Sequence, residues 1–179
     1  MIGVEAAIRI IELASMRLYD GHAPVPVIGP SQALRHAAWA PRSGALPLET
    51  VVSLAAGLPA DVRLDTANLA PPATFAPGLG RVLLNLLLLG ADSLPNGGTV
   101  ALAGSAEDVF VRLAGAGAAL PAGFAALLAD DAAALTALQT ETGLQGAFTV
   151  LLARREGLRL SLVMPPTRQP APPILRLTA

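Results

Sequence analysis

The sequence predicts an α+β fold in which an N-terminal helical segment precedes a two-layer sandwich, with helices on one face of a mixed sheet. Two observations lead to this class. From about residue 61 the expected elements run strand, helix, strand, strand, helix, helix, strand and a candidate final strand. Before that point, helical periodicity alternates with proline-rich and glycine-containing connectors, as in a helical hairpin or bundle.

The amino-acid composition argues against several classes of protein and of functional site. Apolar residues make up 53% of the 179 residues and charged residues 14%, which predicts an ordered domain with a large core. The net charge of −1 favours neither nucleic acid nor an acidic membrane as a partner. The absence of cysteine and the presence of only two histidines argue against a disulfide or a metal cofactor. The longest leucine-rich run, residues 82–91, is about half of a bilayer crossing, and no signal peptide is recognisable, so we expect a cytoplasmic protein.

The first predicted helix covers residues 4–20. Apolar side chains recur along it at spacings of three and four, and Ile10 and Leu13 widen the resulting stripe. So wide a stripe predicts packing on two sides, as in a helix bundle or a dimer interface. The members of the stripe are Val4, Ile8, Ile11, Ser15 and Leu18.

Two shorter helices are expected next. Residues 23–30 form a connector interrupted by prolines. Ser31 is a candidate N-cap for a helix over residues 32–40, because its hydroxyl can accept a hydrogen bond from the first turn. A further helix is expected over residues 47–56.

The middle of the chain predicts the start of the sandwich. Residues 61–65 alternate like a short strand, and residues 68–77 are rich in proline and read as a loop. The helix expected over residues 78–93 is apolar nearly all round, so it should lie between the sheet and another layer. Residues 99–103 and 109–113 then predict a β-hairpin.

The last part predicts two helices and two strands. Alanine-rich helical patterns cover residues 124–138 and 141–156. Residues 158–163 alternate as a strand, and residues 174–177 could add a final one after a proline-rich spacer.

Residues 85–98, with the sequence NLLLLGADSLPNGG, resemble the asparagine box of sensor histidine kinases, roughly N-L-L-x-N-A-x-K-x-x-P-x-G-G. The second asparagine of that box contacts magnesium and phosphate, but it falls here on Leu89, and the lysine falls on Asp92. Because leucine offers no ligand atom, we expect no Mg–ATP binding. We interpret the first asparagine as a helix residue that forms local hydrogen bonds. The matching positions are Asn85, Pro95, Gly97 and Gly98.

Two further kinase motifs are present only in outline. Gly115 and Gly117 have the spacing of a D-x-G-x-G motif, but residues 109–120 contain no acidic residue. We interpret Gly115 and Gly117 as part of a flexible surface loop. Residues 142–146, with the sequence TGLQG, stand where kinases have a glycine-rich turn before a long helix. The order of the motifs is retained, while the residues that contact the nucleotide are missing.

This pattern resembles the ChpT-type histidine phosphotransferases of alphaproteobacteria, whose C-terminal domain is similar to the GHKL-type (Bergerat) ATPase domain of histidine kinases but has lost nucleotide binding. The resemblance spans residues 46–164 and is carried by residues 84–102 and 144–162. It implies a helical dimerisation segment at residues 1–45 and a degenerate ATPase-like domain at residues 46–179. It also implies a homodimer that needs no cofactor and has response-regulator receiver domains as partners in a two-component phosphorelay.

The sequence departs from this family at the phosphate-accepting residue. The family carries its phospho-accepting histidine on the first helix, but residues 4–20 contain none. The candidates are His22 and His36. Such a histidine needs an exposed ring nitrogen and a neighbour that orients the ring. We favour His22, because Asp20 is close in sequence and Gly21 should leave the site exposed. His36 has no adjacent carboxylate, and a surface or packing role is the alternative for both histidines.

Two functions therefore stay open. In the first, a homodimer passes phosphate between a receiver aspartate and its own histidine, and the degenerate domain serves as a docking surface. In the second, the protein is a non-catalytic dimeric scaffold or decoy of the same fold. The family resemblance favours the first, and the first helix without a histidine favours the second. No ATP-dependent kinase activity is expected under either, and a small-molecule pocket is a more distant alternative.

Overall fold

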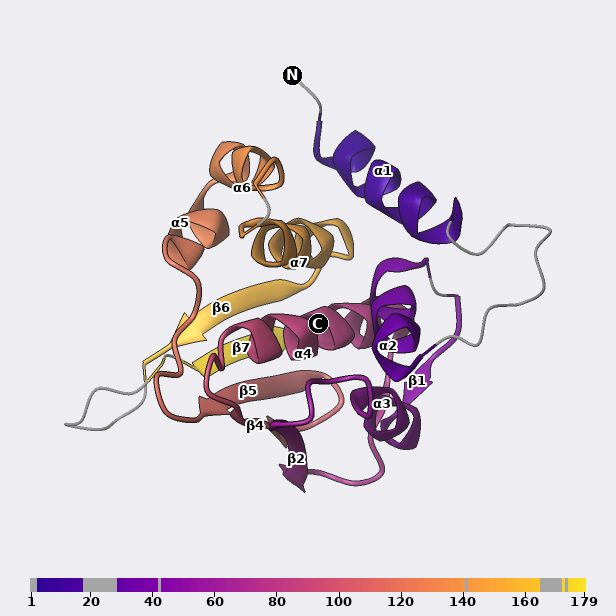
Figure 1. Cartoon of the computed structure of the whole chain (residues 1–179). Helices are drawn as coiled ribbons and strands as arrows, with labels where there is room; N and C mark the ends of the chain where they lie inside the picture. The colour runs from indigo at the N-terminus through magenta and orange to yellow at the C-terminus, as the bar shows by residue number, and fades with distance from the viewer. Residues whose placement is uncertain (1–2, 18–28, 42, 141, 165–171, 173) are drawn as a thin grey trace.

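The computed structural model describes residues 3–17, 29–41, 43–140, 142–164, 172 and 174–179, and it forms an α+β sandwich (Figure 1). One layer is a five-stranded sheet, and the other consists of helices that lie on one face of this sheet. The fold class predicted from the order of elements is therefore confirmed.

The sheet is mixed in strand direction. Its strands are β2 (Val62–Leu69), β4 (Gly98–Gly104), β5 (Asp108–Ala114), β6 (Arg159–Val163) and β7 (Ile174–Thr178). They lie in the order β2-β4-β5-β7-β6, with β2 parallel to β4 and every other pair antiparallel. The last strand of the chain is thus inserted between β5 and β6 and does not lie at an edge. A separate pair of two-residue strands, β1 (Leu46–Pro47) and β3 (Thr74–Phe75), lies beside the main sheet.

The helices form the second layer. They are α1 (Val4–Arg17), α2 (Pro30–Trp39), α3 (Leu48–Ala55), α4 (Pro77–Asp92), α5 (Phe124–Ala129), α6 (Asp131–Ala137) and α7 (Leu144–Arg155). Figure 1 shows α4 and α7 lying over the sheet, with α1 and α6 farther out. Within the described part of the chain, no helix is long and apolar enough to cross a membrane.

The helix α4 is the centre of the core. Every residue from Leu79 to Gly90 is buried, as its all-round apolar sequence predicts. Two of its three glycines, Gly80 and Gly90, let neighbouring elements come close. A Cβ atom on Gly90 would lie 2.9 Å from Val100 of β4, and one on Gly80 would lie 2.8 Å from Leu46 of β1. The helix is therefore held between the sheet and the helices that cover it.

One predicted helix proves to be two. The pattern over residues 124–138 is interrupted at Asp130, which caps the N-terminus of α6. Its carboxylate accepts hydrogen bonds from the backbone amides of Ala132 (2.9 Å) and Ala133 (3.3 Å). The prediction of a single helix there was wrong, because an alanine-rich sequence without Gly or Pro hides a break made by an aspartate cap.

Other limits of the predicted elements also differ from those in the structure. The N-cap of α2 is Gly29 and not the predicted Ser31, because Pro30 already occupies the first turn. β2 extends to Leu69, with an irregular register between Asp65 and Asn68, so it takes up part of the predicted loop. The described part of α1 ends at Arg17, and the predicted residues 18–20 lie outside the described residues.

Candidate functional site

Asn85, the first asparagine of the box, lies on α4 and is fully buried. Its side-chain nitrogen donates to the carbonyl oxygen of Ala38 in α2 (2.7 Å) and to that of Arg81 (3.0 Å). Its side-chain oxygen accepts a hydrogen bond from Nε2 of Gln145 in α7 (3.0 Å). The local bond to Arg81 was expected from the sequence, whereas the bonds to α2 and α7 were not. Asn85 joins three helices and presents no polar atom to a ligand.

Leu89 and Asp92 occupy the other two diagnostic positions of the box. Leu89 is fully buried, and no atom of its side chain could coordinate a metal. Asp92 lies in the wall of a small cavity of about 110 Å³ together with Arg35 and Trp39. Partial burial raises the pKa of the Asp92 carboxyl, and the nearby positive charge of Arg35 opposes this rise. Trp39 Nε1 is buried and has no hydrogen-bond partner in the part of the chain that the structure describes.

The glycines of the first two motifs pack against each other. A Cβ atom on Gly115 would lie 2.4 Å from the carbonyl oxygen of Gly97, and one on Gly98 would lie 2.3 Å from that of Ala114. Gly97 and Gly98 also have positive φ angles of 72° and 144°. Gly115 and Gly117 lie in a surface loop after β5, as expected, but Gly115 is required for close backbone packing. These glycines therefore have a structural reason to be present that involves no phosphate.

The third motif shapes the turn before α7. A Cβ atom on Gly143 would lie 2.7 Å from the carbonyl oxygen of Ala137. Gln145, two residues later, donates both to Asn85 and to Thr149 Oγ1 (3.2 Å). All three stretches that resemble kinase motifs thus contribute to packing, and the first and third also supply hydrogen bonds between helices.

A buried ion network is the feature that sequence reasoning missed. Arg81 of α4 has 1% of its surface exposed, and its Nη1 lies 2.7 Å from Glu12 Oε1 of α1. Its other nitrogens donate to the carbonyl oxygens of Ala38 (3.3 Å) and Trp39 at the end of α2. Arg155 of α7 also contacts Glu12 Oε1, at 2.8 Å. Burial lowers the pKa of Arg81, while its hydrogen bond to Glu12 acts in the opposite direction.

The signal for this network was present in the sequence. Arg81 is a cation inside an otherwise apolar helix, and such a residue requires a buried partner. Glu12 lies next to the apolar stripe of the first helix and could have been named as that partner. Together the two residues tie α1 to the rest of the domain.

Of the two candidate phosphate acceptors, the structure describes only His36. His36 is half-buried on α2, and its carbonyl oxygen accepts a hydrogen bond from the Ala40 amide (2.9 Å). His22 lies outside the described residues. Among the described residues, no group of three or more His, Asp or Glu side chains could hold a metal ion. Both histidines remain predictions.

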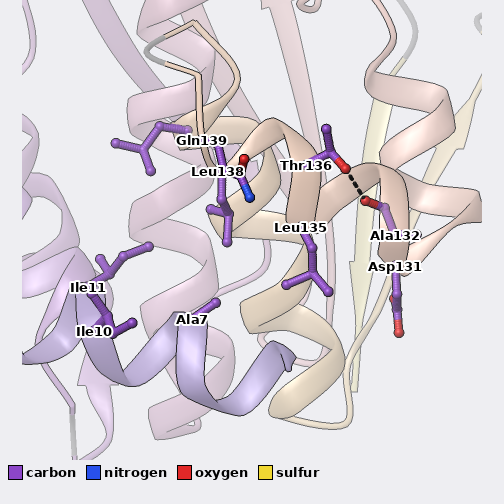
Figure 2. Close-up of a pocket in the computed structure, with 10 residues that line it drawn as sticks. Ala7, Ile10, Ile11, Asp131, Ala132, Leu135, Thr136, Leu138 and Gln139 are labelled. Atoms are coloured by element: carbon purple, nitrogen blue, oxygen red, sulfur yellow. Dashed lines mark hydrogen bonds between the residues drawn. The ribbon is translucent and has the colours of Figure 1, made fainter. Parts of the chain in front are cut away.

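An apolar pocket of about 550 Å³ lies between α1 and α6 (Figure 2). Ile10 and Ile11 of α1 line one side, and Leu135 of α6 and Leu138 just after it line the other. Ile10 is 56% exposed, and Leu13 one turn later is 53% exposed. The helical layer therefore ends in an apolar surface that this chain does not cover in its described part.

Three members of the predicted stripe of α1, Val4, Ile8 and Ile11, face inward. Ile8 is fully buried, and Val4 and Ile11 pack against the core of the same chain. Ala6, Ile10 and Leu13 instead form an outer seam at spacings of four and three, and all three are exposed. The expectation of packing on two sides therefore holds for the inner side, and the outer seam is available to a partner.

The fold and the site together define an α+β domain in which the three stretches that resemble kinase motifs contribute to packing between elements. Residues 48–168 match the model of the histidine phosphotransferase C-terminal domain family, and the chain belongs to this family. The resemblance inferred from the asparagine box is thus confirmed. Membership links the chain to histidine phosphotransfer and so to phosphorelays.

A solved structure supports the fold. A bacterial phosphotransferase aligns with a TM-score of 0.53 and 18% identity, over 98% of this chain and 93% of that chain. At this identity the likeness concerns the fold. A search of curated proteins finds no match.

Proposed function

We propose that the protein is a histidine-phosphotransferase-like component of a two-component phosphorelay, acting in the cytoplasm, which docks response-regulator receiver domains without binding ATP. The observation that carries this proposal is the buried state of Asn85 and Leu89, the two positions that align with the asparagines of the kinase box, because buried side chains in the core are not accessible to a nucleotide. The surface on which a receiver domain would dock is then the outer side of the helical layer. Membership of the phosphotransferase family supports the chemistry.

The proposed chemistry is a phosphoryl transfer between two side chains. A ring nitrogen of the histidine attacks the phosphorus of a receiver aspartyl phosphate, the N–P bond forms, and the O–P bond to the aspartate breaks. The aspartate leaves as a carboxylate, and no nucleotide takes part. His22 is the preferred acceptor, since Asp20 could orient its ring. His36 is the weaker candidate, because it is half-buried on α2, beside the apolar core residues Leu34 and Ala38.

We also propose that the protein is a homodimer, with residues 1–45 as the dimerising segment and residues 46–179 as the docking domain. The outer seam of Ala6, Ile10 and Leu13 supports this assignment, because exposed apolar side chains at this spacing suit another helix. The inner side of the same helix packs against the docking domain, so the two parts would move as one body.

Incubation with a phosphorylated receiver domain tests the phosphotransfer. We expect acid-labile label on the wild-type chain, loss of label in His22→Ala, and retention in His36→Ala. Circular dichroism on each variant checks that the fold is intact. If no phosphorylated receiver labels the wild type, or if neither substitution reduces labelling, the phosphotransfer function is excluded.

A second function is favoured by one observation. The described part of α1, where the family carries its phosphate acceptor, contains no histidine. A dimeric scaffold or decoy would bind receiver domains through the same surface and take no phosphate. Saturable receiver binding by an unlabelled wild-type chain would identify this function.

A further inference from the structure

The face of the sheet opposite the helices carries a cluster of arginines. In Figure 1, α4 and α7 lie on one side of the strands, and the opposite side has no described helix over it. Alternate residues of each strand point to this open face. They include four exposed arginines from four different strands, a third of all arginines and lysines in the chain. These residues are Arg63, Arg112, Arg159 and Arg176.

Three of these arginines form a regular row. Phe110 of β5 is directly opposite Arg176 of β7, so Arg112 is a diagonal neighbour of Arg176. Arg176 in turn is opposite Ser161 of β6, so Arg159 is the next diagonal neighbour in the same direction. Diagonal neighbours on one face of an antiparallel sheet are about 7–8 Å apart. We call Arg112, Arg176 and Arg159 the arginine row.

The middle member of the row is held in place. Asp108 accepts hydrogen bonds from Arg176 Nε (2.9 Å) and Nη2 (2.8 Å). The Arg176 guanidinium also lies over the Phe110 ring, 5.3 Å from its centroid. The two outer members differ, since no ion pair within the described ranges involves Arg112 or Arg159. Their charges are therefore available to a partner.

The charge of this face contrasts with that of the whole chain. This face of the strands carries the four arginines and two acidic residues, Asp65 and Asp108, so its net charge is +2 (4 − 2). The complete chain carries −1. Positive charge is thus concentrated on a flat surface with small central side chains, such as Ala101 and Ala103. Such a surface is complementary to an acidic partner.

We propose that the arginine row docks an extended acidic segment of a partner protein. Side chains on one face of an extended segment repeat at about 6.6–7 Å, two residues at roughly 3.3–3.5 Å each, which is close to the spacing of the row. A segment with Asp or Glu at alternate positions would therefore place one carboxylate near each guanidinium. A protein partner is favoured over single-stranded nucleic acid. Phe110, the aromatic residue beside the arginine row, is covered by Arg176 and is not free to stack on a base. The surface lies on the opposite layer from α1, so this docking is independent of the proposed dimer and of receiver binding to the helices.

Fluorescence anisotropy with a labelled peptide of alternating Glu and Ser tests the proposal. We expect saturable binding that weakens with added salt, and a roughly tenfold or larger loss of affinity in Arg112→Glu and in Arg159→Glu. The matched control is Arg9→Glu on α1. Arg9 has a side chain that is 74% exposed, and the substitution changes the net charge equally on the other layer. Affinity in this control should stay within about twofold of the wild type.

Three results would overturn the proposal. An equal loss of affinity in Arg9→Glu would show that only the net charge matters. Equal binding of the peptide with Gln in place of Glu would remove the role of the carboxylates. Tighter binding of a single-stranded oligothymidine than of the acidic peptide would assign the row to nucleic acid. A thermal melt of each variant separates loss of binding from loss of fold.

Discussion

Arg81 is a charged side chain in the middle of an apolar helix, where burial costs free energy unless the charge is paired and hydrogen-bonded. Its guanidinium meets this requirement with the Glu12 carboxylate and the last carbonyl groups of α2. The carboxylate is shared with Arg155, and Glu156 adds a second anion, 3.9 Å from Arg81 and 3.0 Å from Arg155. Glu12 is the closer of the two anions to both arginines, and it is the one that belongs to α1. The energetic weight of the contact between α1 and the domain should therefore be concentrated in Glu12.

Replacing Glu12 by alanine should lower the free energy of unfolding by about 3 kcal/mol, because it removes the closest carboxylate from the buried Arg81 and leaves it only Glu156 at 3.9 Å. Glu12→Gln should cost less, since an amide oxygen can still accept a hydrogen bond. Urea unfolding can be followed by the fluorescence of Trp39, the only tryptophan, which packs edge-on against Phe148 near the network.

The matched control is Glu5→Ala on the same helix. Glu5 pairs with Arg9 at 4.0 Å, and both side chains are exposed, so its loss should cost less than about 1 kcal/mol. Equal costs for Glu5→Ala and Glu12→Ala would contradict the assignment of the network.

At the same scale, Asn85 shows which contacts can be predicted from the sequence and which cannot. The sequence alone predicts that an asparagine in a leucine-rich helix bonds to its own helix, and the bond to the Arg81 carbonyl confirms this. The contact with Ala38 joins residues 47 positions apart in the chain. No local pattern encodes that contact, because it depends on which turn of α2 lies against α4.

At the scale of elements, hydrophobic periodicity predicted most of what the structure contains. The helix α4 and the hairpin of β4 and β5 lie within one or two residues of their predicted limits, since their apolar residues are strongly periodic. The position of β7 between β5 and β6 was not predicted, because strand order depends on pairing between distant segments. The short β1–β3 pair was missed for the same reason.

The glycine contacts between the turn after α4 and the end of β5 give a prediction about elements. Gly115→Ala should lower the free energy of unfolding by about 1–3 kcal/mol, because its new Cβ would lie 2.4 Å from the Gly97 carbonyl oxygen and the two segments would have to separate. Urea unfolding measures the change. Gly44→Ala is the control, since no heavy atom outside its immediate neighbours lies within 4 Å of its added Cβ.

Gly44→Ala should leave stability within about 0.5 kcal/mol of the wild type. If Gly115→Ala behaves in the same way, the glycine is not needed for packing. Its spacing with Gly117 would then require another explanation, such as a ligand at this loop.

At the scale of the whole molecule, α1 has an inner side that is part of the domain and an outer seam that is not. The outer seam predicts a homodimer, so light scattering should give twice the 18.1 kDa mass of the chain. Leu13→Glu should shift this mass to that of one chain, because a charge would be buried in the interface. Val52→Glu on α3 is the matched control, since Val52 is also an exposed apolar residue. A wild-type monomer with α1 folded would contradict the dimer.

The packing of the helical layer also predicts that the protein does not bind Mg–ATP. In the described structure, the amide of Asn85 is engaged by α2, α4 and α7, Leu89 is buried without a ligand atom, and no acidic side chain stands among residues 109–120. Opening this site would break the hydrogen bonds that join three helices, which the binding of one nucleotide would have to offset. Calorimetric titration of the folded protein with Mg–ATP should therefore show no heat of binding. A micromolar affinity would mean that the helical layer opens readily, and it would return the nucleotide motifs to a functional role.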